Sequence, residues 1–155
     1  MAKAKTIGDS VEIILTHDNA DFDAAGALLA AHKLNPSTIP ILPKQLNQNV
    51  ARFIALYQNG LPFKHLNDIN PAQVTHVTLV DTQRIVHLKG LPAATPVHII
   101  DHHPLTQTLK PHHTLTGETL GAVTTLLVEH IRQSKISLHP LEATLLTMGI
   151  YEDTG

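Results

Sequence analysis

Three mainly apolar runs of the sequence each end in a side chain that can bind a metal. Residues 11–16 are followed by His17, residues 74–80 by Asp81, and residues 96–100 by Asp101. Continuous apolar residues, rather than alternating ones, are typical of strands buried on both faces of a parallel sheet. Because open parallel sheets bind ligands beyond the carboxyl ends of their strands, the three side chains are expected at one edge. The pattern therefore predicts a functional site there.

The segments around these runs predict one α/β domain, a mainly parallel sheet with helices on both faces. Helix formers or helical spacing predict helices over residues 23–34, 47–57 and 119–131, and from Pro140 to about Met148. Residues 39–43 contain two prolines and are expected to form a short edge strand, since proline cannot serve a central ladder. A length of 155 residues suits one domain with a substantial core.

Composition excludes several classes of function. The chain has no cysteine, so thiolate nucleophiles and thiolate metal sites are excluded. A net charge of −2 argues against a broad basic face for nucleic acid. The sequence also contains no membrane-length apolar stretch and no signal-peptide core, so we expect a soluble, cytoplasmic protein.

Eight residues near the expected sheet edge or near the end of the chain can ligate metal. They comprise five carboxylates and three imidazoles: His17, Asp21, Asp23, Asp81, Asp101, His102, His103 and Asp153. A set richer in carboxylate than imidazole suits Mn²⁺ or Mg²⁺ better than Zn²⁺, and more than four ligands suggests two ions. Paired divalent ions hydrolyse phosphate esters and anhydrides, so the set favours that chemistry.

The residues alone leave several alternatives open. Asp101 could be a cap or turn residue, and His103 could be a structural histidine. Asp18 is expected to point to solvent, and His112 and His113 to lie in an exposed loop. The sequence has no Gly-x-Ser-x-Gly nucleophile motif and no Walker-type or Gly-x-Gly-x-x-Gly phosphate loop, which argues against those enzyme classes.

The same residues resemble, in order, the four motifs of the DHH phosphoesterases. These are His17-Asp-Asn-Ala-Asp21-Phe-Asp23, then Asp81, then Asp101-His102-His103, then Glu152-Asp153-Thr154-Gly155. The group includes RecJ-type exonucleases, nano-RNases and family II inorganic pyrophosphatases. The sequence around His17 and the segment 47–63 are most similar to the N-terminal domain of a group of large bacterial proteins. Those proteins combine a DHH domain with CBS domains and a poly(A) polymerase or tRNA nucleotidyltransferase module.

The resemblance implies a domain that binds two divalent cations, Mn²⁺ in preference to Mg²⁺. It assigns six ligands: His17 and Asp21 for one ion, Asp23 and His102 for the other, with Asp81 and Asp153 bridging or shared. A hydroxide between the ions would attack phosphorus. His103 would then contact the substrate phosphate or the departing charge. Asp101 would hold an imidazole in the correct tautomer.

The resemblance also implies missing parts. Residues 1–155 would be the catalytic, metal-binding domain, and the family's second, substrate-binding domain would be absent from this chain. Metal binding with weak or no turnover is then expected, because substrate positioning would be largely lost. The expected substrate is a nucleotide or a short single-stranded nucleic acid, and C-terminal domains are expected in the same chain. No membrane partner is expected, and a homo-oligomer is possible.

The favoured function is a Mn²⁺-dependent phosphoesterase acting on short nucleic acids or nucleotides, as the N-terminal part of a larger RNA-processing protein. An inorganic pyrophosphatase is the near alternative. A third possibility is a metal-binding domain that regulates an attached nucleotidyltransferase without hydrolysing anything. No motif residue is missing from the sequence, which favours catalysis.

Overall fold

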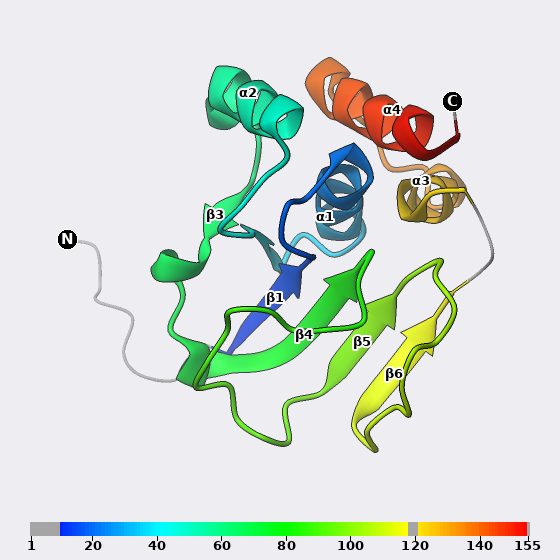
Figure 1. The fold of residues 1–155 in the computed structure, drawn as a ribbon. Coiled ribbons are helices and arrows are strands. Elements are labelled where there is room, and N and C mark those ends of the chain that lie inside the picture. Colours follow the sequence, from blue (N-terminus) through cyan, green and yellow to red (C-terminus); the bar gives the residue numbers. More distant parts are fainter. Residues whose placement is uncertain (1–9, 118–120, 155) are drawn as a thin grey trace.

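Six parallel strands and four α-helices make up the part of the chain that the structure, a computed structural model, describes, residues 10–117 and 121–154 (Figure 1). The strands are β1 (Val11–Leu15), β2 (Ile39–Leu42), β3 (Lys64–His65), β4 (Val74–Val80), β5 (Val97–Ile100) and β6 (His113–Thr116). The helices are α1 (Phe22–Leu34), α2 (Gln48–Tyr57), α3 (Val123–Gln133) and α4 (Pro140–Thr154), with short 3₁₀ segments η1 (Gln58–Gly60), η2 (Leu66–Asp68) and η3 (Pro71–Gln73). The predicted α/β class is confirmed.

The strand order is β3-β2-β1-β4-β5-β6, and every strand pair is parallel. The chain builds outward from β1 to β3, returns to β4, and then builds outward on the other side. The order therefore reverses between β1 and β4. In sheets of this kind such a switch point opens a crevice at the carboxyl ends of the strands. His17 follows β1 and Asp81 follows β4, so both lie at the crevice.

The prediction that residues 39–43 form an edge strand is wrong. Strand β2 lies between two neighbours and changes partner along its length. Ile39 and Pro40 pair with β1, whereas Ile41 and Leu42 pair with β3. The two residues that pair with β3 keep their N–H groups, so Pro40 removes a donor only from the short pairing with β1. The edge strand on this side of the sheet is the two-residue β3, which the sequence did not reveal.

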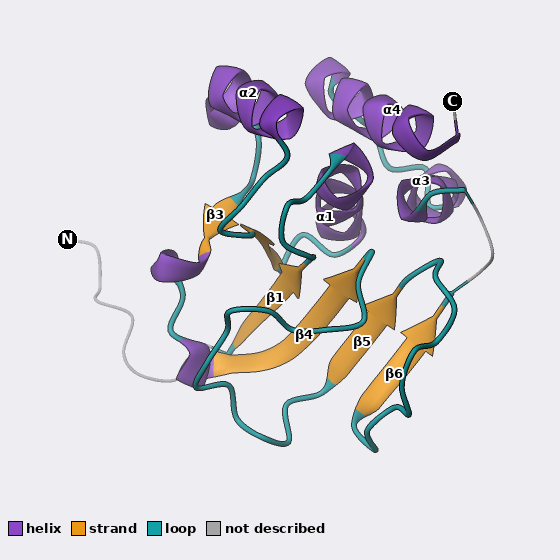
Figure 2. Cartoon of the chain, in the orientation of Figure 1, coloured by secondary structure: helices purple, strands orange, loops and turns teal. Residues whose placement is uncertain are grey.

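One face of the sheet, called here the helical face, is covered by the four α-helices (Figure 2). Ile14, Val80 and Ile100 point from the strands into this core. Leu28 of α1 and Leu127 of α3 are fully buried against it. Burying large side chains of this kind stabilises a fold by roughly 1.5–3 kcal/mol each.

The opposite face, called here the loop face, has little helical cover. Its strand residues, Ile13 and Leu79 among them, pack against Leu66 of η2 and against apolar loop residues such as Ile85 and Leu109. The predicted cover by helices on both faces is thus reduced on this side to a single 3₁₀ turn. Segments 81–96 and 101–112 connect β4, β5 and β6 across it.

Two expectations about local structure change. Helix α4 extends to Thr154, beyond the predicted end at Met148, and α3 is described from Val123, while the predicted start at Thr119 lies outside the described residues. His112 lies in the turn before β6, as predicted, but it is half-buried rather than exposed. His113 is half-buried and opens β6, so its prediction as an exposed loop residue is wrong.

Close contact between α1, α3 and α4 depends on two glycines. A Cβ atom at Gly149 would lie 2.8 Å from the Phe22 carbonyl oxygen and 2.8 Å from Thr124 Oγ1. A Cβ atom at Gly26 would lie 2.7 Å from the same hydroxyl. Since real Cβ atoms do not approach so closely, only glycine lets α4 and α3 pack this tightly on α1. The packing brings the carboxyl end of α4 to the amino end of α1.

Candidate metal centre

Asp81 lies at the centre of the candidate site. It follows β4 with φ of 56°, in the left-handed region that aspartate tolerates better than most residues, and its backbone N–H donates to Ile100 O over 3.0 Å. Its side chain is buried between two imidazoles. Oδ2 lies 3.2 Å from His17 Nε2, and Oδ1 lies 3.3 Å from His102 Nε2. One carboxylate thus faces ligands from two different strands.

The buried Oδ1 of Asp81 accepts no hydrogen bond from any described residue. A buried acceptor without a donor costs roughly 1–3 kcal/mol, and more when the group is charged. A divalent cation between this oxygen and the surrounding imidazoles would satisfy it. The arrangement therefore fits a metal ion, because carboxylate oxygen and imidazole nitrogen are its usual ligands.

His17 presents a defined ring atom to Asp81. Its Nδ1 lies 2.8 Å from the Asp18 carbonyl oxygen, so Nδ1 carries a proton and Nε2 faces the site. The pKa of His17 is raised to about 9, and the hydrogen bond to Asp81 is the largest cause. Burial of the imidazole acts in the opposite direction and lowers the pKa. Without a metal the imidazole is thus protonated near neutral pH, and a bound ion has to displace the Nε2 proton.

Asp21 completes the first group of possible ligands. Its Oδ1 lies 4.0 Å from His17 Nε2 and also accepts the backbone N–H of Ala24, which caps α1. The cap fixes the carboxylate relative to the helix. His17, Asp21 and Asp81 each offer one ligand atom, and these atoms lie within 4.8 Å of one another.

Asp23, His102 and Asp153 form a second group within the same distance. Asp23 is fully buried, and its two carboxylate oxygens accept the backbone N–H groups of Val123 and Thr124 at the start of α3. Burial and the nearby Asp81 carboxylate raise the pKa of Asp23, although these hydrogen bonds oppose the rise. A cation would relieve the same repulsion.

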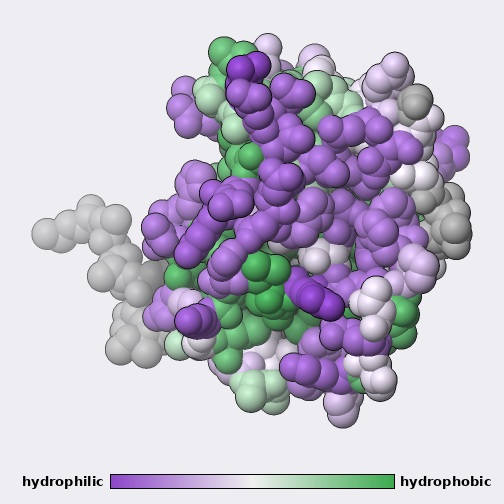
Figure 3. Space-filling model, viewed as in Figure 1, coloured by the Kyte–Doolittle hydropathy of each residue, from purple (hydrophilic) through white to green (hydrophobic). Residues whose placement is uncertain are grey.

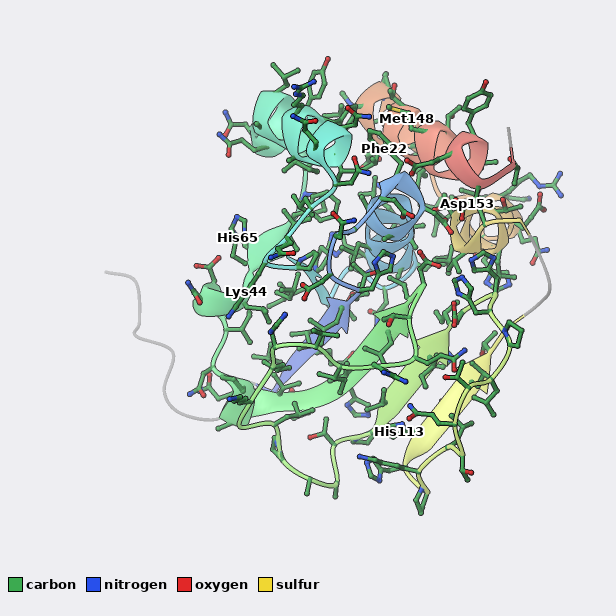
Figure 4. The ribbon with its side chains drawn as sticks, viewed as in Figure 1. Phe22, Lys44, His65, His113, Met148 and Asp153 are labelled. Atoms are coloured by element: carbon green, nitrogen blue, oxygen red, sulfur yellow. The ribbon has the colours of Figure 1, made fainter. Side chains whose placement is uncertain are left out.

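Asp153 reaches the second group from the carboxyl end of α4, next to α3 (Figure 4). Burial, followed by the charges of Asp23 and Asp21, raises its pKa. The preceding Glu152 accepts the backbone N–H of Phe22 over 2.5 Å and so holds the end of α4 on the start of α1. Glu152 therefore positions the helix end that carries Asp153.

Asp101 holds the triplet in place. It is buried, and its Oδ1 accepts His103 Nδ1 over 2.8 Å and the backbone N–H of His102 over 3.0 Å. The other oxygen accepts Gln83 Nε2 over 2.8 Å. His103 itself is exposed, and its ring centroid lies 4.1 Å from that of His102. These contacts suit a positioning carboxylate better than a simple turn residue.

Sequence reasoning missed Gln83. This buried amide donates to Asp101, to the backbone oxygens of His103 and Pro104, and accepts both the backbone N–H and the hydroxyl of Thr106. It thereby joins the loop after β4 to the loop after β5. Its place two residues after Asp81 was the only signal that could have pointed to it.

Asp18 was expected to face solvent, but it is half-buried and contacts His87 Nε2 through Oδ2. Since the Asp18 backbone oxygen orients His17, His87 is linked to the metal centre through one residue. His87 lies in the loop after β4 with φ of 60°. The expectation of a solvated Asp18 is therefore wrong.

All eight predicted site residues are brought together at the switch point. Asp81 and His102 each belong to more than one of the three possible ligand groups, and Asp153 belongs only to the group with Asp23 and His102. Their role as ligands stays a prediction.

None of the helices within the described ranges is long and apolar enough to span a membrane.

Comparison with known proteins identifies the family. The family model described as the DHH family, N-terminal domain, matches residues 12–150. The chain belongs to the DHH family. The predicted resemblance is confirmed.

Two curated relatives of this DHH domain are A-adding tRNA nucleotidyltransferases. The chain is 35% identical to that of Geobacter sulfurreducens over 94% of its length, and 33% identical to that of Aquifex aeolicus over 93%. In both cases it spans only 17% of the relative. The domain is therefore related to the tRNA nucleotidyltransferases over about a sixth of their length.

Solved structures share the fold. A candidate family II inorganic pyrophosphatase of Methanococcus jannaschii matches 93% of this chain and 48% of its own, with a TM-score of 0.70 and 23% identity. An exopolyphosphatase-related protein of Bacteroides fragilis matches 94% and 46%, with a TM-score of 0.68 and 19% identity. At such identities the likeness shows the fold alone.

Proposed function

We propose that this DHH domain is the metal-binding half of a two-metal phosphoesterase for nucleotides or short single-stranded nucleic acids. It would act as the N-terminal part of a larger RNA-processing protein related to poly(A) polymerases and tRNA nucleotidyltransferases. The observation that carries the proposal is Asp81, whose two oxygens face His17 on one side and His102 on the other. A shared carboxylate of this kind is what two adjacent cations require.

The ligand groups divide the work. His17 and Asp21 would hold one ion, Asp23, His102 and Asp153 the other, and Asp81 both. When bound, two divalent ions roughly 3.5–4 Å apart lower the pKa of a water between them and neutralise phosphoryl charge. Mixed nitrogen and oxygen ligands favour Mn²⁺ over Mg²⁺.

The remaining two residues would orient the substrate. Asp101 accepts a hydrogen bond from His103 Nδ1–H. The other ring nitrogen, Nε2, would then face a phosphate oxygen or the leaving group. His103 is exposed, so a substrate could reach its ring, whereas Asp101 is buried. We propose His103 as a catalytic residue and Asp101 as its positioning residue.

A second candidate rests on the relatives. Both are named for A-addition to tRNA, so the domain could bind metal and regulate an attached nucleotidyltransferase without hydrolysis. The complete set of carboxylates and imidazoles argues for catalysis, because a regulator has no need of two adjacent ligand groups. A pyrophosphatase remains the third reading.

Phosphate release separates the three. The chain is incubated with Mn²⁺ and pyrophosphate, 3′-phosphoadenosine 5′-phosphate or a short RNA, and phosphate or mononucleotide is measured. We expect slow release from the nucleotide or RNA, lost in Asp81→Asn, which keeps the left-handed backbone, and retained in the matched control Asp68→Asn on the surface. Release from pyrophosphate alone would indicate a pyrophosphatase. Mn²⁺ binding without any release, both from this chain and from the larger protein proposed to contain it, would indicate the regulator.

A further inference from the structure

The loop face carries a cavity that the metal centre does not use. It has a volume of about 410 Å³ and lies between the segments that follow β4 and β5 and the start of β6. Small-molecule sites have volumes of roughly 300–1,000 Å³, so the cavity is large enough for one small ligand. Its floor is formed by strand residues such as Leu79 and Val97, and His113, at its rim, is marked in Figure 4.

The walls of this cavity are basic. Arg84, Lys110, His112 and His113 line it, together with the amides of Gln83 and Gln107, and no aspartate or glutamate among the residues that the structure describes does. Neither Arg84 nor Lys110 forms an ion pair with another described residue. Two cationic side chains are thus available to an anion.

The local charge contrasts with that of the whole chain. Residues 82–117 contain three basic residues and one acidic residue, Asp101, together with six of the twelve histidines. The rest of the chain has eight basic residues against twelve acidic ones. Burial first, and then the charges of His112 and Lys110, lower the pKa of His113, as expected where positive charge is concentrated.

We propose that this loop-face cavity binds a small phosphorylated ligand of mononucleotide size. Arg84 and Lys110 would contact the phosphate, since guanidinium and ammonium groups are its usual partners. The apolar floor would receive the base, and the two glutamine amides offer donors and acceptors for its edge. The hydrophilic and apolar areas of this face lie side by side in Figure 3.

A mononucleotide fits better than a longer RNA. An extended strand needs basic side chains that follow its backbone past a single pocket. In segment 82–117 the only further lysine or arginine is Lys89. A volume of about 410 Å³ also suits one small ligand better than several nucleotides.

The site is distinct from the metal centre but adjoins it. Gln83 lines the cavity and also donates to Asp101, which holds His103. A nucleotide added to the protein could therefore reach either place. For that reason the test is made without divalent ions, so that binding at the metal centre is removed.

The test is calorimetric titration of the 155-residue chain in EDTA with AMP, inorganic phosphate and a six-nucleotide RNA. We expect saturable binding of one AMP, weaker binding of phosphate, and a loss of roughly tenfold in AMP affinity for Arg84→Gln and for Lys110→Gln. The control Arg52→Gln removes a charge from exposed α2 and should bind AMP like the unaltered chain.

A second measurement locates the ligand. In proton NMR spectra of the histidine rings, AMP should shift the signals of His112 and His113, and the Asp81→Asn variant should show the same shifts. The proposal is overturned if AMP does not saturate, if all variants bind AMP alike, or if only the RNA binds. A shift confined to His17 and His102 would also overturn it, because the nucleotide would then lie at the metal centre.

Discussion

On the helical face, backbone N–H groups of helix α1 or α3 fix Asp21 and Asp23, whereas on the loop face two of the three groups that hold Asp101 are side chains. Asp21 caps its own helix, and Asp23 accepts two N–H groups at the start of α3. Asp101 is held by the Gln83 amide, by the ring of His103 that it orients, and by one backbone N–H, that of His102. Helix ends are rigid parts of a packed core, while the loop contacts depend on one amide.

Because of this difference, substitutions on one face should affect mainly the stability of the fold, and those on the other mainly the geometry of the site. Changes on the helical face should unfold the domain, because the same groups that hold the site also join α1 to α3 and α4. Changes on the loop face should leave the core intact and disturb only the triplet. Substitutions on the two faces should therefore have effects of different size and kind.

The largest effect is expected for Asp23→Ala. The change leaves the N–H groups of Val123 and Thr124 buried and without their acceptor, at a cost of roughly 1–3 kcal/mol for each group. We expect the free energy of unfolding in urea, measured in EDTA, to fall by about 3 kcal/mol or more. If Asp23→Ala unfolded no more easily than Gln83→Ala, the distinction between the faces would be lost.

Gly149→Ala should have the next largest effect. The added Cβ would lie 2.8 Å from the Phe22 carbonyl oxygen, and backbone cannot easily move away. Overpacking costs roughly 1–3 kcal/mol, of which the better helix propensity of alanine returns up to about 1. The thermal midpoint should fall, and Mn²⁺ binding should weaken because Asp153 moves with α4.

The matched control lies in the same helix. Thr147→Ala changes an exposed position of α4 and should leave both the thermal midpoint and Mn²⁺ binding nearly unchanged. A fall in stability for Gly149→Ala without any loss of Mn²⁺ affinity would argue that Asp153 is not a ligand.

On the loop face, Gln83→Leu should have a local effect. The change removes the donor to Asp101 and the acceptor for Thr106, and we expect a loss of roughly 1–2 kcal/mol in unfolding free energy. Amide hydrogen exchange should become faster in residues 101–107, while exchange in α1 and α3 stays slow. Equal acceleration in the helices would contradict the proposed independence of the loop face.

The sequence predicted the helical side of this comparison far better than the loop side. Strand ends and ligand spacing are encoded in the run before His17 and in the interval from Asp21 to Asp23, so both could be predicted without a structure. The pattern His-Thr-Leu-Thr of β6 has one apolar residue, and therefore gave no strand signal. Gln83 and His87 act through long-range contacts, which no local pattern records.

The last effect concerns the proton on His17, and its sign is opposite for stability and for metal binding. Because the folded pKa is raised from 6.5 to about 9, the His17–Asp81 interaction stabilises the metal-free fold fully below pH 6.5 and is lost as pH rises through 9. Mn²⁺ must displace the same proton, so its affinity should rise with pH, by at most about tenfold per unit below 9. Calorimetric Mn²⁺ titrations at pH 7, 8 and 9 measure this slope. The slope should persist in Gln83→Leu and shrink in Asp81→Asn, and a slope that disappeared with Gln83 instead would show that the loop face, rather than the strand ends, controls the His17 proton.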